Sequence, residues 1–387
     1  MSLSRVAVVC DFREENWPSM DLVADQLLAH LQKDHASTVK ATPICPPMRR
    51  RFTRKHTASG ELFNADRLVN RFWDYPRLAR RRRAEFDLFH VVDHSYAQLV
   101  HHLPPGRAII TCHDLDTFQC VLEPARERRS VPFRWMVRRT LSGFRKAARV
   151  TCDSFATRDQ LLAHELVSPQ KVVVIPNGVH PAYSASPDDQ SDAAAARLLG
   201  HKKCADTIEL LHVGSTIGRK RIDVLLKIFA TLREEFPQAR LIRAGGPLTR
   251  EQTRLANQLG LSEYIVTLPR LDEKVLAAVY RRAALVLLPS EREGFGLPLV
   301  EAMACGTPVL ASDLPVLREV GCDAALYCPV GDVQAWSKSS ARLLRERSER
   351  PARWAERRAK GIAHAAKFGW AEYAKSMVSL YKQLLRV

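Results

Sequence analysis

Short apolar runs recur along the chain and alternate with longer segments that have helical periodicity. Each run has the length of a buried strand, and each intervening segment is long enough to form a helix. Right-handed βαβ units with this alternation build parallel sheets that helices cover on both faces. The sequence therefore predicts an α/β chain. The predicted strands are 6–10, 86–92, 108–112, 150–152, 172–175, 208–213, 239–244, 264–268, 284–288, 308–311 and 325–327.

The succession of strands is interrupted by a small, polar segment at residues 181–207. We interpret this segment as a linker between two Rossmann-like domains, an N-terminal one at 1–180 and a C-terminal one at 208–366. Ligands of such sheets bind outside the carboxyl ends of the strands, so we expect the two domains to face each other across a crevice. The remaining residues, 367–387, are expected to form a helix that packs back toward the first domain.

The composition is that of a folded chain with more than one domain. A length of 387 residues exceeds what one hydrophobic core usually serves, which excludes a single small binding module. Hydrophobic residues make up 46% and charged residues 26%, a balance typical of globular proteins. The nine cysteines include no Cys-x-x-Cys pair, and several, among them Cys10, lie in or beside apolar runs. We therefore expect reduced core thiols in a cytoplasmic protein, with neither a signal peptide nor a membrane-spanning segment.

Charge narrows the range of partners. The chain has 59 Lys and Arg against 42 Asp and Glu, a formal net charge of +17, which predicts an anionic partner such as a phosphate compound, nucleic acid or acidic lipid. Arginines cluster in the first half at 49–55, 77–83 and 126–149. We hypothesise that these clusters dock the first domain on an anionic membrane, where each basic residue contributes about 1 kcal/mol. Nucleic acid is less favoured as a partner, because the sequence has no recognised nucleic-acid-binding motif.

A glycine-containing loop, 214–218, follows the predicted strand 208–213. Strand, loop and helix occur in the order of a phosphate-binding site, because the free N–H groups at a helix start attract an anion. Arg219, Lys220 and Arg221 come next. Cations at a helix N-terminus oppose the macrodipole by about 0.3 to 1 kcal/mol each, and a bound diphosphate would reverse this effect. The alternative is that all three side chains extend into water.

Two glutamates lie around the start of a short helix after the predicted strand 284–288. Pro298 suits the first helical position and Gly306 the position just past the last turn, so Glu301 lies in the opening turns. A carboxylate there can accept both hydrogen bonds of a ribose diol, each worth about 1.5 to 3 kcal/mol where water is excluded. Glu293 lies in the preceding glycine loop. The alternatives are that Glu301 only complements the helix dipole and that Glu293 is a solvated loop charge.

The most specific motif covers residues 293–309. It resembles the Glu-x7-Glu signature of the retaining GT-B glycosyltransferases, most closely the sugar-nucleotide-dependent family 4, also called glycosyl transferases group 1. Four shorter segments, 175–179, 213–220, 244–246 and 368–370, are similar to the same family in the same order. The likeness covers nearly the whole second domain and is weak in the first. It implies a GT-B fold of two Rossmann-like domains.

The resemblance implies a role for each matching residue of the second domain. Arg219 and Lys220 would hold the donor diphosphate, and Glu301 would hold the nucleotide ribose. Glu293 and the backbone after it would contact the transferred sugar, and the strand end near Leu271 would bind the base through backbone atoms. The donor-binding set implied in this way is Gly214, Thr216, Arg219, Lys220, Leu271, Gly294, Phe295, Gly296, Leu297 and Glu301.

His113 directly follows the predicted strand 108–112. The resemblance implies that His113 lies beside the donor sugar and belongs with Glu293 to the catalytic set. Retention would proceed by front-face attack, in which the leaving phosphate helps to deprotonate the acceptor. The alternative for His113 is a turn or capping role. Asp114 and Asp116 match the metal-binding Asp-x-Asp of the other glycosyltransferase fold, but we expect no metal, because the cationic cluster already supplies positive charge for the diphosphate.

These residues together predict a retaining, metal-independent hexosyltransferase that needs no cofactor. It would move a hexose, with mannose or glucose favoured, from a nucleotide diphosphate sugar to a saccharide or lipid-linked acceptor of envelope or polysaccharide synthesis. We expect the protein in the cytoplasm, at the inner face of the membrane. The alternatives are a catalytically degenerate GT-B scaffold and, less favoured, a nucleic-acid-binding protein.

Overall fold

The computed structural model describes most of the chain. The described residues are 3–54, 60–125, 127–200 and 207–385. Residues 201–206 of the predicted linker, and Lys55 and Arg126 of the arginine clusters, lie outside these ranges. No helix within the described ranges is long and apolar enough to cross a bilayer.

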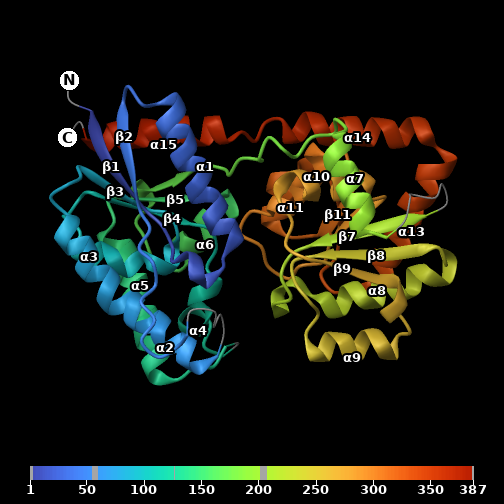
Figure 1. Cartoon of the computed structure of the whole chain (residues 1–387), viewed down its shortest axis with the longest axis horizontal. Coiled ribbons are helices and arrows are strands. Elements are labelled where there is room, and N and C mark those ends of the chain that lie inside the picture. The colour runs from blue at the N-terminus through green and yellow to red at the C-terminus, as the bar shows by residue number, and fades with distance from the viewer. Residues whose placement is uncertain (1–2, 55–59, 126, 201–206, 386–387) are drawn as a thin grey trace. The chain divides into compact units, whose positions relative to one another are not determined.

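The chain divides into two compact units. The first comprises Met1–Gly178 together with Trp370–Val387, and the second comprises Val179–Gly369. Each unit contains one six-stranded parallel sheet with helices packed against it (Figure 1). Every apolar run that was predicted to be a strand forms one, so the predicted α/β architecture with parallel sheets is confirmed.

The sheet of the first unit has the strand order β2-β1-β3-β4-β5-β6. Both of its faces are buried. Neighbouring residues of a strand point to opposite faces, so Ala7 and Val9 of β1 pack into one apolar cluster and Val6 and Val8 pack into another. Its strands are β1 (Ser4–Val9), β2 (Val39–Ile44), β3 (Leu88–Val91), β4 (Ala108–Cys112), β5 (Arg149–Cys152) and β6 (Val172–Val174). Its helices are α1 (Pro18–Asp34), α2 (Glu61–Val69), α3 (Tyr75–Arg82), α4 (Gln119–Leu122), α5 (Val131–Lys146), α6 (Phe155–Ala163) and α15 (Trp370–Leu385).

The edge strand β2 was not predicted from the sequence. Of its six residues only Val39 and Ile44 are buried, and Pro43 interrupts the pattern near its end. An edge strand has one partner strand and tolerates proline, so its sequence lacks the continuous apolar run of a central strand. β2 pairs with β1 in parallel, with Val9 opposite Ile44.

Two cysteines follow these paired strands. Cys10 comes directly after β1 and Cys45 directly after β2, and their Cα atoms lie 5.0 Å apart in a disulfide. The expectation that the cysteines are reduced is therefore wrong for this pair, because the strand register brings together two residues that lie far apart in the sequence. The other described cysteines are free, and all of them except Cys322 are buried.

The sheet of the second unit has the strand order β12-β11-β10-β7-β8-β9. On one face, α8 packs against α13 around the fully buried Trp336. The strands are β7 (Ile208–Val213), β8 (Ala239–Ala244), β9 (Ile265–Leu268), β10 (Leu285–Leu288), β11 (Val309–Ser312) and β12 (Leu326–Cys328). The helices are α7 (Asp189–Leu198), α8 (Ile222–Glu235), α9 (Arg250–Gln258), α10 (Glu273–Arg282), α11 (Leu297–Ala304), α12 (Pro315–Gly321), α13 (Val333–Glu349) and α14 (Pro351–Ala365).

The predicted linker and the predicted C-terminal segment both contain a helix. Part of the segment that was expected to be a linker forms α7, which packs against α10 through an ion pair of 2.6 Å between Arg281 and Asp192. After α14 the chain returns to the first unit as α15, which packs beside α1 (Figure 1). The predicted return of the C-terminal helix to the first domain is confirmed.

Candidate active site

The loops that follow β7 and β10 meet at one edge of the second unit's sheet. β7 and β10 are paired parallel neighbours, so their carboxyl ends lie side by side. The backbone N–H of Glu291 donates to the carbonyl of Arg219 over 2.7 Å, which joins the two loops. This pairing brings the cations after β7 next to the glutamate loop after β10, although more than 70 residues separate Lys220 from Glu293.

Glu293 is the counter-ion of the cationic cluster. Its Oε1 accepts hydrogen bonds from Lys220 Nζ at 2.6 Å and from Ser290 Oγ at 2.7 Å, and Arg219 Nη1 lies 3.7 Å from its Oε2. The Glu293 side chain is 7% exposed. Burial alone would raise the pKa of Glu293, but Lys220 and Arg219 lower it below the usual value, so Glu293 is ionised. The interpretation of Glu293 as a solvated loop charge is therefore wrong.

The three cations of the cluster have different positions. Arg219 and Lys220 lie in a 3₁₀ turn before α8, and their side chains are 20% and 12% exposed. Arg219 also donates to the backbone carbonyl of Arg292 at 3.1 Å. Arg221 is the N-cap residue of α8 and pairs with Asp223 through two hydrogen bonds of 3.0 Å. The alternative in which all three extend into water is therefore wrong.

Glycines allow a close approach of the loops after β7 and β8. Gly214 has a φ of +152° and Gly245 a φ of +131°. A Cβ on Gly245 would lie 2.2 Å from the carbonyl oxygen of Gly214, so no larger residue fits there. Below this contact, the fully buried Arg243 donates to His212 Nδ1 at 3.0 Å. Burial lowers the pKa of Arg243 to about 10, which leaves it charged at neutral pH, beneath the predicted phosphate loop.

Glu301 lies in the middle of α11 and is 7% exposed. The hydroxyl of Tyr280 donates to Glu301 Oε2 at 2.8 Å. Burial raises the pKa of Glu301 to about 7, although hydrogen bonds from Tyr280 and Tyr183 act in the opposite direction. Both protonation states are therefore populated near neutral pH. The two tyrosines were not singled out from the sequence, because their distance from Glu301 depends on how α10 and the chain before α7 pack around α11.

The loop between Glu293 and α11 is fixed by its side-chain packing. Gly296 is the N-cap of α11 with a φ of +92°, and a Cβ there would lie 2.6 Å from Leu317 Cδ2. Phe295 is buried, with its ring edge-to-face to Phe368 at 5.7 Å. Helix α11 begins at Leu297. The segment from Gly294 to Leu297 is therefore held in place directly after Glu293.

The remaining donor-binding candidates lie along the same sheet edge. Thr216 is half-buried in the loop after β7, and its carbonyl accepts a hydrogen bond of 3.1 Å from Gln252 Nε2. Leu271 follows β9 and is half-buried. In the strand order, β9 lies two strands beyond β7, so Leu271 is the most distant of these residues from Lys220 along the edge.

His113 lies at the carboxyl end of β4 in the first unit. Its Nδ1 is 2.6 Å from Asp153 Oδ2 and its Nε2 is 2.7 Å from the carbonyl oxygen of Val92. Burial would lower the pKa of His113, but the Asp153 carboxylate and the bond to Val92 raise it to about 9. Both ring nitrogens therefore donate at neutral pH, and His113 provides a fixed positive charge. Sequence reasoning missed Asp153, whose signal is its position directly after the strand 150–152.

A second group of polar residues lies at the ends of β1 and β3, which are neighbours. The carboxyl groups of Asp11 and Asp93 are both buried. Burial and the Asp93 charge raise the pKa of Asp11 well above its usual value. For Asp93, burial opposes ionisation, but His94 and the two hydrogen bonds from Ser95 lower its pKa. Asp11 thus holds the proton of the pair, a role that its sequence position did not reveal.

Asp114 and Asp116, the alternative metal motif, are arranged as a turn. The N–H of Asp116 donates to Asp114 Oδ1 at 3.0 Å, and His94 Nε2 lies 3.6 Å from the same oxygen. Among the described residues, no group of three or more His, Cys, Asp and Glu side chains is placed to hold a metal ion.

Both halves of the chain match models of one enzyme family. The model named Glycosyltransferase Family 4 matches residues 21–183, and the model named Glycosyl transferases group 1 matches residues 201–361. The chain therefore belongs to the family 4 glycosyltransferases, as the sequence motifs predicted. It is 33% identical over 256 residues to D-inositol 3-phosphate glycosyltransferase 1 from Catenulispora acidiphila, an alignment that covers 62% of this chain and 58% of that protein.

A second relative is the D-inositol 3-phosphate glycosyltransferase of Mycolicibacterium smegmatis, which is 32% identical over 243 residues. This alignment covers 59% of this chain and 53% of the relative. The chain thus matches little more than half the length of these curated relatives.

Solved structures with the same fold cover nearly the entire chain. Sucrose-phosphate synthase from Thermosynechococcus elongatus superposes with a TM-score of 0.78 at 21% identity, covering 98% of this chain and 99% of that structure. Anabaena HepE in complex with UDP and glucose superposes with a TM-score of 0.70 at 17% identity, covering 98% and 100%. These likenesses confirm the predicted GT-B fold.

Proposed function

We propose that the protein is a retaining hexosyltransferase that transfers mannose or glucose from a nucleotide diphosphate sugar. The acceptor would be a saccharide or lipid-linked compound of envelope or polysaccharide synthesis. The observation that carries this proposal is the contact between Lys220 and Glu293, with Arg219 beside them, at the joined ends of β7 and β10. The arrangement supports the proposal because the two cations would bind the diphosphate and the adjacent carboxylate would contact the sugar that the diphosphate carries.

The donor would bind along the carboxyl edge of the second unit's sheet. Arg219 and Lys220 would bind the diphosphate together with the backbone of Gly214 and Thr216, because guanidinium and ammonium groups form strong charge-assisted hydrogen bonds with phosphate oxygens. Glu301 would accept hydrogen bonds from the ribose diol in its ionised state. The base would contact the backbone near Leu271, which is why the sequence does not identify the base.

Catalysis would use charges that the protein already holds in place. The acceptor hydroxyl attacks the anomeric carbon on the face from which the nucleoside diphosphate leaves, the bond from that carbon to the diphosphate breaks, and the hydroxyl proton moves to the leaving phosphate. Lys220 and Arg219 stabilise the negative charge that develops on the leaving group. Glu293 and His113 would contact the transferred sugar. His113 acts through its positive charge, since both of its ring nitrogens are engaged.

The test is a calorimetric panel of GDP, UDP and ADP, each with its mannose or glucose derivative. D-inositol 3-phosphate belongs among the acceptors, because two curated relatives are named for it. Lys220→Ala and Glu301→Ala should each lower affinity for the preferred nucleotide about tenfold or more, the equivalent of one charged hydrogen bond, and remove most turnover. Lys227→Ala, an exposed residue of α8, should leave both unchanged.

The possible results of this panel distinguish the proposed donor site from the alternative functions. Full affinity and turnover in both folded variants would overturn the site assignment. A panel in which no nucleotide binds would favour the catalytically degenerate scaffold. Circular dichroism of each variant checks folding, because Lys220→Ala leaves the buried Glu293 without its closest cation.

We further propose that the protein works in the cytoplasm at the inner face of the membrane. The support is α5, which carries much of the arginine cluster 126–149. Its buried face packs into the core, while Val131, Phe133 and Trp135 are exposed at 66%, 37% and 63% among these basic residues. Exposed aromatic side chains between cations suit a surface of anionic lipid.

Co-sedimentation with vesicles tests this location. The protein should bind vesicles that contain phosphatidylglycerol at low salt and should bind more weakly at high salt. The double change Phe133→Ala with Trp135→Ala should weaken binding, whereas Phe155→Ala, which removes an exposed ring from α6, should not. The absence of co-sedimentation at low salt would disprove the proposal.

A further inference from the structure

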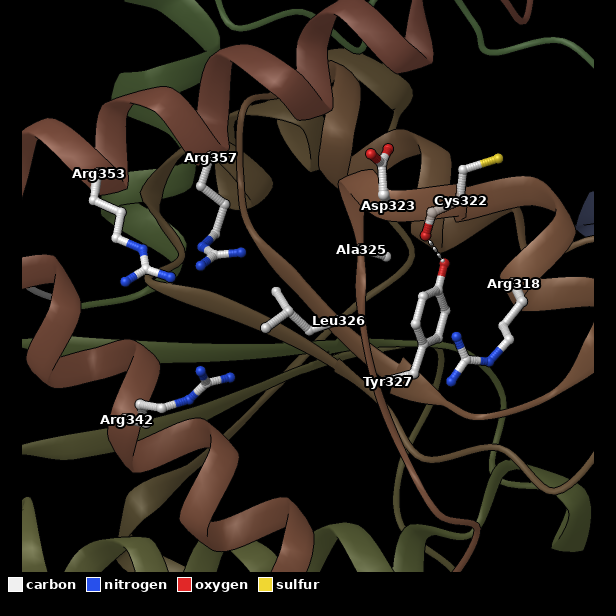
Figure 2. Close-up of a pocket in the computed structure, with 9 residues that line it drawn as sticks. All are labelled: Arg318, Cys322, Asp323, Ala325, Leu326, Tyr327, Arg342, Arg353 and Arg357. Atoms are coloured by element: carbon white, nitrogen blue, oxygen red, sulfur yellow. Dashed lines mark hydrogen bonds between the residues drawn. The ribbon is translucent and has the colours of Figure 1, made fainter.

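A hollow of about 610 Å³ lies in the second unit beside the edge strand β12 (Figure 2). The helices α12, α13 and α14 contribute arginines to it, and the residues around β12 form its floor. The short 3₁₀ helix Cys322–Ala324, which also borders the hollow, leads into the amino end of β12. Lys220 and Glu293 follow the carboxyl ends of parallel strands, so this hollow lies at the other end of its strand and is distinct from the candidate active site.

The lining is strongly basic. Four arginines, Arg318, Arg342, Arg353 and Arg357, face a single lining carboxylate, that of Asp323. Asp323 is itself paired with Lys360 at 2.8 Å, so it does not neutralise the arginines.

The arginines differ in how they are held. Glu346 is buried and binds Arg357 through hydrogen bonds of 3.0 and 3.2 Å, while Arg353 Nε lies 3.4 Å from its Oε2. One carboxylate therefore orients two guanidinium groups. Arg342, one helical turn before Glu346 on α13, has no ion pair with any residue in the described part of the chain.

On the other side of the hollow, a guanidinium group lies over a tyrosine ring. The guanidinium of Arg318 lies 4.7 Å from the centre of the Tyr327 ring and pairs with Asp313. The Tyr327 hydroxyl donates to the carbonyl oxygens of Leu317 and Cys322, which fixes the ring. Figure 2 shows Leu326 between Arg318 with Tyr327 on one side and the other three arginines on the other. The hollow thus combines cations, three of which pair with carboxylates, with a small apolar floor.

We propose that this pocket binds the phosphate group of a phosphorylated small molecule or of a lipid headgroup. Arginines present paired N–H donors that match phosphate oxygens. Among the described residues, Glu346 is the carboxylate that pairs with guanidinium groups on this side, so the side keeps an excess of positive charge that a further negative charge would balance. An anion at Arg342 and Arg353 supplies that charge, and Leu326 and Tyr327 contact the body of the ligand.

The experiment uses inorganic pyrophosphate as the soluble probe, measured by calorimetry on the full chain at low salt. The Lys220→Ala background separates this pocket from the candidate active site, which also binds diphosphates under the proposed function. Pyrophosphate should bind to the Lys220→Ala protein, and the added changes Arg342→Gln and Arg353→Gln should weaken binding about tenfold or more. Arg345→Gln is the matched control, because Arg345 lies on the same helix but pairs with Glu235.

Vesicles distinguish the two sources of the phosphate group. Binding to vesicles that contain phosphatidic acid, but not to pyrophosphate, with loss in the Arg342→Gln and Arg353→Gln protein, would assign the pocket to a lipid headgroup. Vesicle binding is measured with the added changes Phe133→Ala and Trp135→Ala, which weaken the separate contact proposed for α5. Binding of either probe to that protein that the arginine changes leave intact would overturn the proposal, and so would the absence of binding to both probes. None of these outcomes depends on transferase activity.

Discussion

At the scale of single residues, two carboxylates of the candidate site differ in protonation because their neighbours differ. Glu293 and Glu301 are both nearly buried. Lys220 and Arg219 outweigh the effect of burial at Glu293. At Glu301 burial outweighs the hydrogen bonds from two tyrosine hydroxyls, and its pKa rises to about 7. Glu293 is therefore a permanent anion, and Glu301 changes charge within the physiological pH range.

The raised pKa of Glu301 predicts a specific dependence of stability on pH. A carboxyl group whose pKa is higher in the folded state stabilises the fold fully below its unfolded pKa, near 4.5, and loses this effect as pH rises through about 7. Relative to Glu301→Gln, the free energy of unfolding of the wild type should therefore fall by about 3 kcal/mol between pH 4.5 and pH 8. Urea unfolding of both proteins across this range measures the change, and parallel pH profiles would contradict it.

The same sign is expected at His113, over a higher pH range. Its folded pKa of about 9 lies above the usual value of 6.5, so its pairing with Asp153 stabilises the fold fully below pH 6.5 and loses this effect as pH rises through about 9. Asp153→Asn should lower the pKa of His113 and cost about 3 kcal/mol at pH 6, with a smaller cost at pH 10. NMR titration of the His113 ring and urea unfolding measure the two effects. Asp159→Asn, an exposed change on α6, is the control, and an unchanged His113 titration would refute the assignment.

Individual partners of this kind were not predictable from the sequence. His113 and Glu293 could be selected, because each directly follows or lies near a predicted strand end. Asp153 and Asp11 also follow predicted strands directly, but their pairing with His113 and Asp93 could not be predicted, since it depends on which strands are neighbours in the sheet and on the register between them. The same holds for the tyrosines around Glu301, which sequence periodicity marks only as core residues.

At the scale of elements, the start of α11 depends on one glycine. Gly296 has a φ of +92°, and a side chain there would meet Leu317 of α12. This helix could be predicted from the sequence, because Pro298 and Gly306 mark its two ends. The sequence did not reveal β2, whose edge position requires few apolar residues, or α7, whose small polar sequence resembles a linker.

Gly296→Ala should therefore damage the site through its backbone. We expect a loss of about 1 to 3 kcal/mol of stability, because the left-handed conformation and the contact with Leu317 both penalise a Cβ. Affinity for the donor nucleotide should fall as well, since the neighbouring backbone would shift. Gly246→Ala is a matched control for stability: its φ is +101°, but no atom lies within 4 Å of the added Cβ. Equal losses in the two variants would show that the clash with Leu317 does not matter.

At the scale of the whole molecule, the family and the GT-B fold could be predicted from the sequence. The contacts by which the C-terminal helix completes the core of the first unit could not. α15 supplies Trp370, Tyr373, Met377 and Tyr381 to the apolar cluster that covers one face of the first sheet. The Tyr381 hydroxyl lies 2.7 Å from His90 Nδ1, a buried contact between α15 and β3. The C-terminal helix is therefore part of the first unit's core.

Met377→Ala should test this dependence. Met377 is fully buried, so its truncation should cost about 2 to 5 kcal/mol in the free energy of unfolding. Lys375→Ala, an exposed change on the same helix, should cost little. Urea unfolding followed by the fluorescence of the chain's tryptophans measures both, and equal midpoints for the two variants would show that α15 is dispensable for the core.

The position of α15 in the chain also sets the order of events during synthesis. The ribosome makes Val179–Gly369 between the two parts of the first unit, a delay of roughly 10 to 40 seconds at about 5 to 20 residues per second. Throughout that interval, Val6 and Val8 of β1 lack the helix that covers them. The nascent first unit therefore waits with an open apolar face, and the second unit is the first part of the molecule that can finish folding.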